Sequence, residues 1–203
     1  MILITKLIYN FILFPFLMIL MAIGALFNKK IREGISGRLK SINELIKFSK
    51  QRKVWEKCYW FHAASFGEYE QIRPVLAGLK EVEPTAKIIT SFFSPSGYNN
   101  VHDDHIDCKI YLPFDFPWTI RKAMKLTHPR KLIFAAYDIW PNLIWSAHKR
   151  KIHSTLFAAR FVKGTKKLKP IIRNFYRSVY RYFKTIYTVD KSDYVRVQKL
   201  VKG

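Results

Sequence analysis

One carboxylate stands out among the residues that could do chemistry, because of where it falls in the chain. Residues 60–68 read Trp-Phe-His-Ala-Ala-Ser-Phe-Gly-Glu, an apolar strand-like run that turns at Gly67 and places Glu68 at the expected start of a helix. Ligands of α/β proteins bind outside the carboxyl ends of parallel strands, so this is a favoured place for a functional carboxylate. Ser65-x-x-Glu68 also fits a capping box, in which both side chains satisfy free amides at a helix N-terminus. Local spacing leaves both interpretations open.

Two further loops carry polar or aromatic side chains after an apolar run. In residues 137–142 (Tyr-Asp-Ile-Trp-Pro-Asn), Asp138 suits a helix cap, whereas Trp140 and Asn142 suit stacking on and hydrogen bonding to a sugar or base. Residues 94–98 (Ser-Pro-Ser-Gly-Tyr) offer hydroxyls and helix-start amides, which favour either an anion site or a plain turn and cap. The residues of this second loop with a candidate binding role are Ser94, Ser96 and Gly97.

A possible metal-binding motif occurs at residues 102–105, which read His-Asp-Asp-His. The motif falls in an expected surface loop and has no further supporting cluster of ligands. We therefore expect a solvated loop here and predict no metal site.

The segment from Lys163 to Lys184 contains eight basic residues and no acidic one. Its arginines follow helical i, i+4 spacing at Arg173, Arg177 and Arg181, and an apolar face lies opposite. An amphipathic helix with a basic face is typical of contact with a membrane surface or with phosphate groups. A solvated face on a basic protein is the alternative.

The pattern of the chain after residue 58 predicts a parallel sheet. Strand-like runs at 59–64, 86–92, 108–112, 131–136, 153–158 and 185–189 alternate with helical stretches at 67–81, 96–101, 116–127, 140–150, 166–183 and 190–202. Such alternation predicts βαβ units in a sheet covered on both faces. Right-handed crossovers then bring the loops that follow the strands together along one edge.

The N-terminal segment has a different character. Residues 7–27 contain no side chain that is charged at neutral pH, and about 20 apolar residues are enough to span a bilayer. Lys29, Lys30 and Arg32 follow directly, which by the positive-inside rule keeps the rest of the chain in the cytosol. We predict a membrane anchor over 1–27, with a signal peptide or an in-plane helix as alternatives. A basic amphipathic connector is expected over 28–57 and a Rossmann-like domain over 58–203.

The composition narrows the functional class. The 203 residues carry 36 Lys and Arg against 14 Asp and Glu, a net charge of +22, and residues 151–203 hold 14 of the basic residues and only two acidic ones. Such a field attracts nucleic acid, anionic lipid or phosphorylated substrates. Charge is the sole support for nucleic acid, since no recognised nucleic-acid motif occurs. The two cysteines form no metal or disulfide pattern, and no glycine-rich nucleotide-phosphate loop is present.

Taken together, these stretches resemble the N-terminal half of bacterial transferases of 3-deoxy-D-manno-oct-2-ulosonic acid (Kdo). The matching pieces occur in family order and spacing: residues 62–68 (His-Ala-Ala-Ser-Phe-Gly-Glu), Arg73-Pro74, 91–98, 111–115 (Tyr-Leu-Pro-Phe-Asp), 139–142 (Ile-Trp-Pro-Asn) and Ala159-Arg160. The combination is specific, although each piece alone is weak.

The resemblance implies the N-terminal half of a GT-B glycosyltransferase, preceded by a transmembrane helix. Such an enzyme moves Kdo from CMP-Kdo to lipid A precursor at the cytoplasmic face of the inner membrane during lipopolysaccharide synthesis. It implies that Glu68 is the general base and that the acceptor is bound on this side of the cleft. No cofactor is implied besides the donor substrate. The expected acceptor-binding residues are Ser65, Gly67, Ser94, Ser96, Gly97, Asp138, Trp140, Asn142, Arg160, Arg173, Arg177 and Arg181.

Two departures from the family pattern bear on these expectations. The family usually has Glu-x-Glu before Ile/Leu-Trp-Pro-Asn, where this chain has Ala136-Tyr137-Asp138. The chain also stops at Gly203, near the expected start of the linker to the CMP-binding domain, so we expect a truncated, inactive acceptor-side domain. A non-enzymatic module that binds anionic lipid through residues 163–184, or a glycosyltransferase with another lipid acceptor, are the competing functions.

Overall fold

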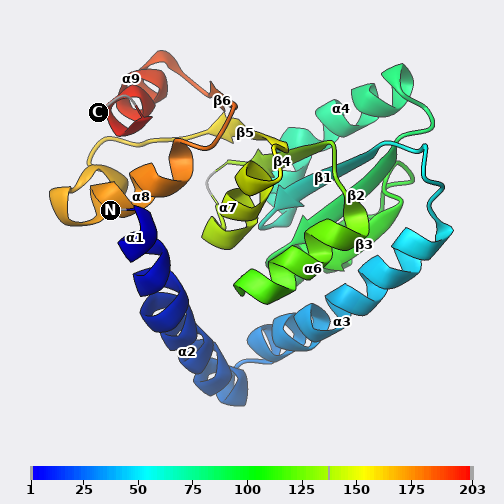
Figure 1. Cartoon of the computed structure of the whole chain (residues 1–203), viewed down its shortest axis with the longest axis horizontal. Coiled ribbons are helices and arrows are strands. Elements are labelled where there is room, and N and C mark those ends of the chain that lie inside the picture. Colours follow the sequence, from blue (N-terminus) through cyan, green and yellow to red (C-terminus); the bar gives the residue numbers. More distant parts are fainter. Residues whose placement is uncertain (1, 137, 202–203) are drawn as a thin grey trace.

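Six parallel strands form a single sheet at the centre of the molecule (Figure 1). The computed structural model describes residues 2–136 and 138–201. The strands run in the order β3-β2-β1-β4-β5-β6, with these bounds: β1 Cys58–Ala63, β2 Lys87–Phe92, β3 Cys108–Tyr111, β4 Lys131–Ala135, β5 His153–Ala159 and β6 Thr185–Thr188. Every neighbouring pair is parallel. The predicted α/β fold and its parallel sheet are confirmed, and the predicted strand ends differ from the observed ones by about one residue.

Helices cover both faces of the sheet, because alternate side chains of each strand point to opposite faces. In β1, Trp60 belongs to one core, whereas Tyr59 and Phe61 belong to the other. The second core is closed by α4 (Phe66–Val82) and α5 (Pro95–Asn100). The first core takes side chains from helices α3 Lys29–Gln51, α6 Pro117–Thr127, α7 Pro141–Lys149, α8 Pro170–Tyr180 and α9 Lys191–Val201.

The predicted helix over residues 166–183 is wrong in its extent. The structure has a short 3₁₀ turn, η2 (Lys166–Leu168), and then α8, separated by an extended Lys169. Proline disfavours a helical conformation in the residue before it, so Pro170 forces this break and begins the new helix. Arg181 follows the end of α8 as its C-cap residue.

The apolar N-terminal segment is a helix that runs along the outside of the domain. It comprises α1 (Ile2–Ile8), a π-helical turn η1 (Tyr9–Leu13) and α2 (Phe14–Phe27). The π turn lies directly before Pro15, whose ring would clash with a regular helical turn there. Residues Leu3–Phe27 are the one stretch among the described residues long and apolar enough to cross a membrane.

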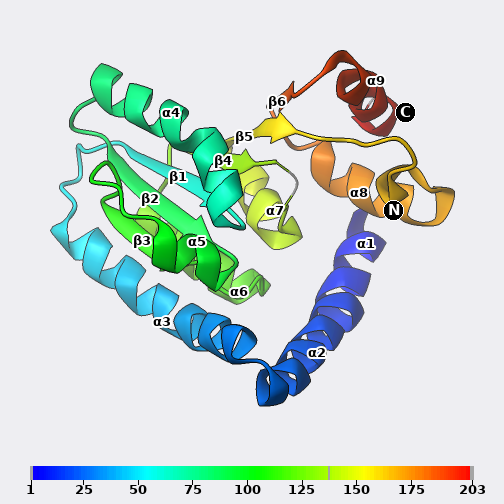
Figure 2. The ribbon, with the colours of Figure 1, turned by 180° about the vertical axis from the view of Figure 1, so that it is seen from behind.

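The connector that follows packs on the domain. After a turn at Asn28, whose side chain accepts hydrogen bonds from the amides of Lys30 and Ile31, α3 runs back along edge strand β3. Seen from both sides, α2 and α3 form two arms of a V with the sheet between them (Figures 1 and 2). The buried side of α3 follows Gly34, Arg38, Ser41, Leu45 and Phe48. Leu39 of the same helix is exposed.

Candidate functional site

The candidate site lies at the carboxyl ends of β1 and β4, which are neighbours in the sheet although they are far apart in sequence. This is the point where the strand order reverses, and open α/β sheets bind ligands in the crevice there. The loop after β1 leads into α4, whose first turn carries Glu68, and the loop after β4 carries Asp138. A contact of 3.2 Å between His62 Nε2 and Asp138 Oδ2 joins the two loops.

Glu68 sits in the first turn of α4 and is only 6 % exposed. Its Oε2 accepts a hydrogen bond from the Ala64 amide at 2.5 Å, so the carboxylate reaches back over the strand end. Ser65 is the N-cap residue, but its side chain makes no capping bond, so only half of the expected capping box forms.

Burial raises the pKa of the Glu68 carboxyl above its ordinary value. The negative charge of Asp138 acts in the same direction, whereas backbone hydrogen bonds from Ala64 and Ser65 and the charge of His62 act against it. A carboxylate with a raised pKa is a stronger base. The arrangement therefore suits proton abstraction, with the capping bond as a second role of the same side chain.

His62 is fully buried at the end of β1 and is held on both sides of its ring. Its Nδ1 lies 3.0 Å from both the carbonyl oxygen and the hydroxyl of Ser91 in β2. That hydroxyl also accepts a hydrogen bond from Trp60 Nε1 at 2.8 Å. The Nε2–H group points to the Asp138 carboxylate after β4. The orientation of the His62 ring is therefore set by Ser91 of β2 on one side and by Asp138 on the other.

Asp138 is partly exposed, with 26 % of its side chain accessible. Burial raises its pKa, but hydrogen bonds from His62 and Trp140 and the attraction of His62 and Arg38 outweigh that, so its pKa is lowered and it is ionised. Trp140 donates Nε1–H to Asp138 at 3.1 Å and stacks on Phe93. The expected stacking surface of Trp140 is thus partly covered by the protein.

The loop after β2 lies against the Glu68 loop, because the Ser94 amide donates to the Ala64 carbonyl oxygen at 2.8 Å. The hydroxyls of Ser94 and Ser96 bond to each other, and Ser94, the N-cap residue of α5, makes no capping bond with its side chain. Gly97 is buried against Phe92, where a Cβ would lie 2.4 Å from the ring. Gly97 is therefore required for packing, whereas Gly67 faces open space.

Sequence reasoning missed Asp115, which is fully buried below the β4 loop. It accepts hydrogen bonds from the amides of Asn142 at 2.9 Å and Leu143 at 3.0 Å, and so caps α7 from a distant loop. Asn142 is also buried, and its side-chain amide donates to Asn10 and to the Asp115 carbonyl oxygen. The contacts of Asn142 are structural, so its predicted role in acceptor binding is not carried further. The family-like run 111–115 was the only sequence signal for Asp115.

Arg38 and Lys167 are two cations near Asp138 that the sequence did not single out. Arg38 is buried and donates to the Phe93 carbonyl oxygen at 2.6 Å, and burial lowers its pKa to about 10. Lys167 donates to the Tyr180 hydroxyl at 2.6 Å, and burial lowers its pKa to about 8. Each lies in a segment that contains several other Lys and Arg residues, so its local sequence does not distinguish it from them.

The three arginines of the basic segment do not act together. Arg173 donates to the Lys199 carbonyl oxygen in α9 at 2.6 Å. Arg181 lines a hollow of about 340 Å³ with His153 and Lys184, which lie at the amino ends of β5 and β6. A crossover helix carries the chain from the carboxyl edge back to the amino edge, so its last turn lies opposite Glu68. Arg181 therefore lies at the edge of the sheet opposite Glu68, whereas Arg160 directly follows the carboxyl end of β5 and is exposed.

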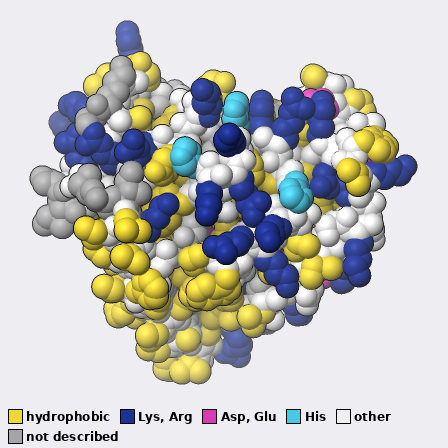
Figure 3. All heavy atoms as spheres, in the orientation of Figure 1, with side chains coloured by type: hydrophobic (Ala, Val, Ile, Leu, Met, Phe, Trp, Pro, Cys, Tyr) yellow, Lys and Arg dark blue, Asp and Glu magenta, His cyan; other side chains and the backbone are white. Residues whose placement is uncertain are grey.

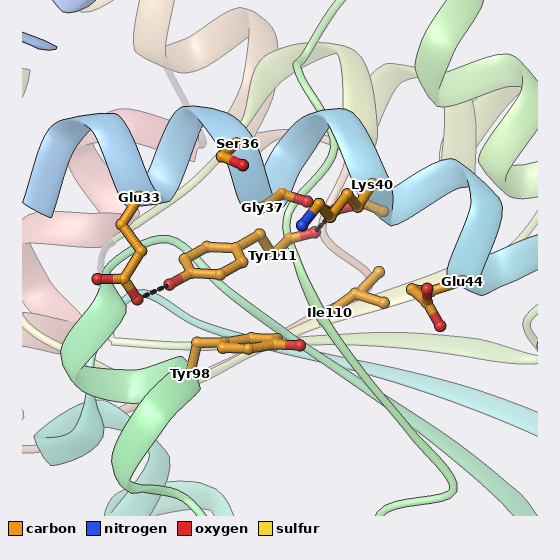
Figure 4. A pocket seen from close by; sticks show the side chains of 9 residues that line it. Glu33, Ser36, Gly37, Lys40, Glu44, Tyr98, Ile110 and Tyr111 are labelled. Carbon is orange, nitrogen blue, oxygen red and sulfur yellow. Dashed lines mark hydrogen bonds between the residues drawn. The ribbon is translucent and has the colours of Figure 1, made fainter.

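A second cavity, of about 290 Å³, lies between α3 and edge strand β3 (Figure 4). The rings of Tyr98 and Tyr111 stack in it, and Tyr111 donates its hydroxyl hydrogen to Glu33 at 3.0 Å. Neither Glu68 nor Asp138 lines this cavity. Over residues 2–136 and 138–201, no three His, Cys, Asp or Glu side chains are placed to hold a metal ion.

The family model described as 3-deoxy-D-manno-octulosonic-acid transferase (kdotransferase) matches residues 34–202. The chain belongs to this family. Two bacterial relatives carry the name 3-deoxy-D-manno-octulosonic acid transferase: one from Aquifex aeolicus is 34 % identical over 87 residues, which is 42 % of this chain, and one from Haemophilus influenzae is 31 % identical over 103 residues, which is 50 %. A probable mitochondrial one from Arabidopsis thaliana is 29 % identical over 104 residues, also 50 % of this chain.

The matched part of this kdotransferase-family chain covers 24 % of the two bacterial relatives and 23 % of the plant one. The family model, which matches residues 34–202, includes both loops of the candidate site. Ala136 has a left-handed backbone, with φ of 56°, at the position where the family pattern has its first Glu. Tyr137 lies outside the described residues. The shortened acid, Asp138, still reaches His62.

Proposed function

We propose that this chain is the acceptor-side domain of a GT-B Kdo transferase, which transfers Kdo from CMP-Kdo to lipid A precursor in lipopolysaccharide synthesis. The observation that carries the proposal is the buried Glu68 carboxylate at the sheet's switch point, with its pKa raised. Family membership supports Kdo transfer as the reaction. The apolar N-terminal helix supports a location at the inner membrane, and the basic residues that follow it support a domain on the cytoplasmic face.

In the proposed reaction, the Glu68 carboxylate takes the proton from an acceptor hydroxyl. The oxygen then forms a bond to the anomeric carbon of Kdo while the bond from that carbon to CMP breaks and CMP leaves with its electron pair. His62 and Asp138 hold the two loops around Glu68. Ser65, Ser94, Ser96 and Arg160 are the partly or fully exposed polar groups that we assign to the acceptor.

The test is Glu68→Gln in an enzyme that joins this domain to a donor-binding domain. A general base contributes about 10²–10⁴-fold, so Kdo transfer should fall at least about 100-fold while the melting temperature stays near that of the parent. Gln is accepted at this capping position, so a purely capping Glu68 predicts unchanged transfer. In the parent, transfer should decline as the pH falls through the raised pKa of Glu68, because the base must be ionised.

Glu70→Gln provides the matched control, because Glu70 is exposed in the same helix and makes only a surface ion pair with Arg73. That variant should keep parent activity. A folded Glu68→Gln enzyme with parent-like turnover would show that Glu68 is not the base. The 203 residues alone should transfer no Kdo, since the resemblance assigns CMP-Kdo to the other half of the enzyme.

A further inference from the structure

The apolar N-terminal helix is fastened to the domain along one stripe. Tyr9 and Phe14 are buried, and Met18 packs partly buried against the same core. The Tyr9 ring contacts those of Trp145 in α7 and Phe175 in α8. The Phe14 ring meets, edge to face, the rings of Phe116, before α6, and Trp140, before α7.

Hydrogen bonds reinforce this stripe. The Tyr9 hydroxyl donates to Asp115 Oδ2 at 2.9 Å, and the Asn142 side-chain amide donates to Asn10 Oδ1 at 2.7 Å. Both bonds are buried or partly buried; the Asp115 carboxylate caps α7, and Asn142 lies in the first turn of that helix. Releasing the helix would leave a buried carboxylate and a buried amide short of a partner, which is costly. The helix and the candidate site are thus parts of one packed unit.

The opposite side of the same helix is exposed and wholly apolar. Its exposed side chains recur along the whole length of the segment: Leu3, Ile4, Leu7, Ile8, Phe11, Ile12, Leu13, Phe16, Leu17, Ile19, Leu20, Ile23, Leu26 and Phe27. In Figure 3 hydrophobic side chains gather over the lower left and bottom of the molecule, where α1 and α2 lie in Figure 1. Lys and Arg side chains gather directly above them. A contiguous apolar surface of this extent marks a membrane or protein contact.

The fastened stripe is incompatible with a helix that crosses the bilayer. Tyr9 precedes Phe27 by 18 residues, which is about 27 Å along a helix axis. If Phe27 lay at the cytoplasmic boundary of a hydrocarbon core about 30 Å thick, Tyr9 would lie near its far side. Asp115, Asn142 and the start of α7 would be carried into the hydrocarbon with it. Polar groups and non-helical backbone are not tolerated in contact with lipid at that depth.

We propose that the helix Ile2–Phe27 lies in the plane of an anionic bilayer, with its apolar side in the lipid and the domain fastened to its other side. The flanking cations fit this arrangement: Lys29 and Lys30 follow the helix, and α8, which carries Arg177, lies against α1. Helices with an apolar and a polar side lie about 5–10 Å into the boundary between headgroups and acyl chains. The candidate site is then held close to the bilayer surface, where a lipid acceptor would be presented.

Protease protection distinguishes the two orientations. A polar epitope tag is placed before Met1, and the chain is inserted into sealed inner-membrane vesicles with the cytoplasmic face outward. An in-plane helix leaves the tag on the same side as the domain, so external protease should remove both. A crossing helix protects the tag until detergent opens the vesicles, and that result would overturn the proposal.

Lipid depth gives a second, independent readout. Spin labels at Phe11, Ile19 and Leu26 should all lie at a similar, shallow depth, whereas a crossing helix predicts that Ile19 lies deepest. A label at Val54, which is fully exposed in the loop before β1, is the matched control and should not contact lipid. Labels that never contact lipid and are also shielded from water-soluble reagents would show that a protein partner covers this face, and the proposal would be wrong.

Neither measurement depends on Kdo transfer. A protected tag would contradict the in-plane helix but would not bear on the proposed reaction. An inactive enzyme would contradict the proposed reaction but would not bear on the orientation of the helix. The proposal rests on the membrane location in the proposed function, but not on its chemistry.

Discussion

The carboxylates of Glu68, Asp115 and Asp138 lie at one edge of the sheet, and their surroundings give them different properties. Burial dominates for Glu68 and Asp115, whose pKa values are raised. Hydrogen bonds from His62 and Trp140 dominate for Asp138, whose pKa is lowered. Groups whose environments separate their pKa values in this way take different roles. Glu68 is suited to accept a proton, and Asp138 is suited to remain charged.

At the residue scale, the buried carboxyl group of Asp115 predicts a pH dependence of the free energy of unfolding. Burial raises its pKa to about 7, against about 3.9 in an unfolded chain. Between these values the native state holds a proton that the unfolded state has lost, so this group's contribution to stability falls as the pH rises and is constant above about pH 7. In Asp115→Asn this dependence should disappear, so the stability of the variant relative to the parent should be greater at pH 8 than at pH 5.

Melting temperatures of the two proteins in detergent at these two pH values measure the difference. Asp104→Asn, in an exposed loop, is the control and should follow the parent at both. Equal pH dependence in Asp115→Asn and the parent would show that Asp115 does not titrate in this range.

Among the elements, the connector helix α3 packs closely on the sheet because of small residues on its buried side. Gly37 allows the ring of Tyr111 to lie against the helix backbone, and a Cβ there would be 2.1 Å from that ring. Ser41, one turn later, donates its hydroxyl hydrogen to the Tyr111 carbonyl oxygen at 2.6 Å. The connector helix is thereby fixed to edge strand β3.

Gly37→Ala should destabilise the domain by about 1–3 kcal/mol, because extra volume in a packed contact forces the ring or the helix to move. Gly78→Ala is the matched control: Gly78 lies inside α4 with nothing within 4 Å of a Cβ. Its replacement should stabilise by about 0.5–1 kcal/mol through helix propensity. Urea unfolding of the two variants measures both, and a stabilised Gly37→Ala would disprove the close contact.

At the scale of the whole molecule, the excess of positive charge favours contact with an anionic surface. The net charge is +22, and the basic residues are concentrated in the last quarter of the chain. Arg177 and Arg181 lie on or just after α8, and α8 contacts α1 of the apolar helix. Arg173 is committed to α9, so it is a poor candidate for lipid binding.

Arg177→Gln combined with Arg181→Gln should weaken binding to vesicles that contain anionic lipid by about 30-fold, since each basic residue near such a surface contributes about 1 kcal/mol. Binding of the parent should also weaken as salt is added. Lys50→Gln with Lys53→Gln removes two exposed charges at the far end of α3 and should have less effect. Vesicle co-sedimentation measures all three proteins, and equal binding would favour a merely solvated face on α8.

The sequence by itself determined the α/β class, the parallel sheet, the position of Glu68 at a strand end and the apolar N-terminal segment. These features depend on local patterns: alternation of strand and helix, small residues after an apolar run, and length without charge. A proline is also a local signal, because it disfavours a helical conformation in the residue before it. Pro170 is such a signal: it ends the extended stretch at Lys169 and begins α8.

Only the tertiary structure decided which of the candidate residues meet. Asp115 caps a helix that begins 26 residues later, and Tyr9 reaches it from 106 residues away. Arg181 lies at the opposite edge from Glu68 because a crossover helix returns the chain across the sheet. Such contacts depend on the order of the strands and on which helix side is buried, and no local spacing encodes either. The same reason applies to the apolar helix: its composition predicted a membrane contact, and its buried stripe indicates how it lies there.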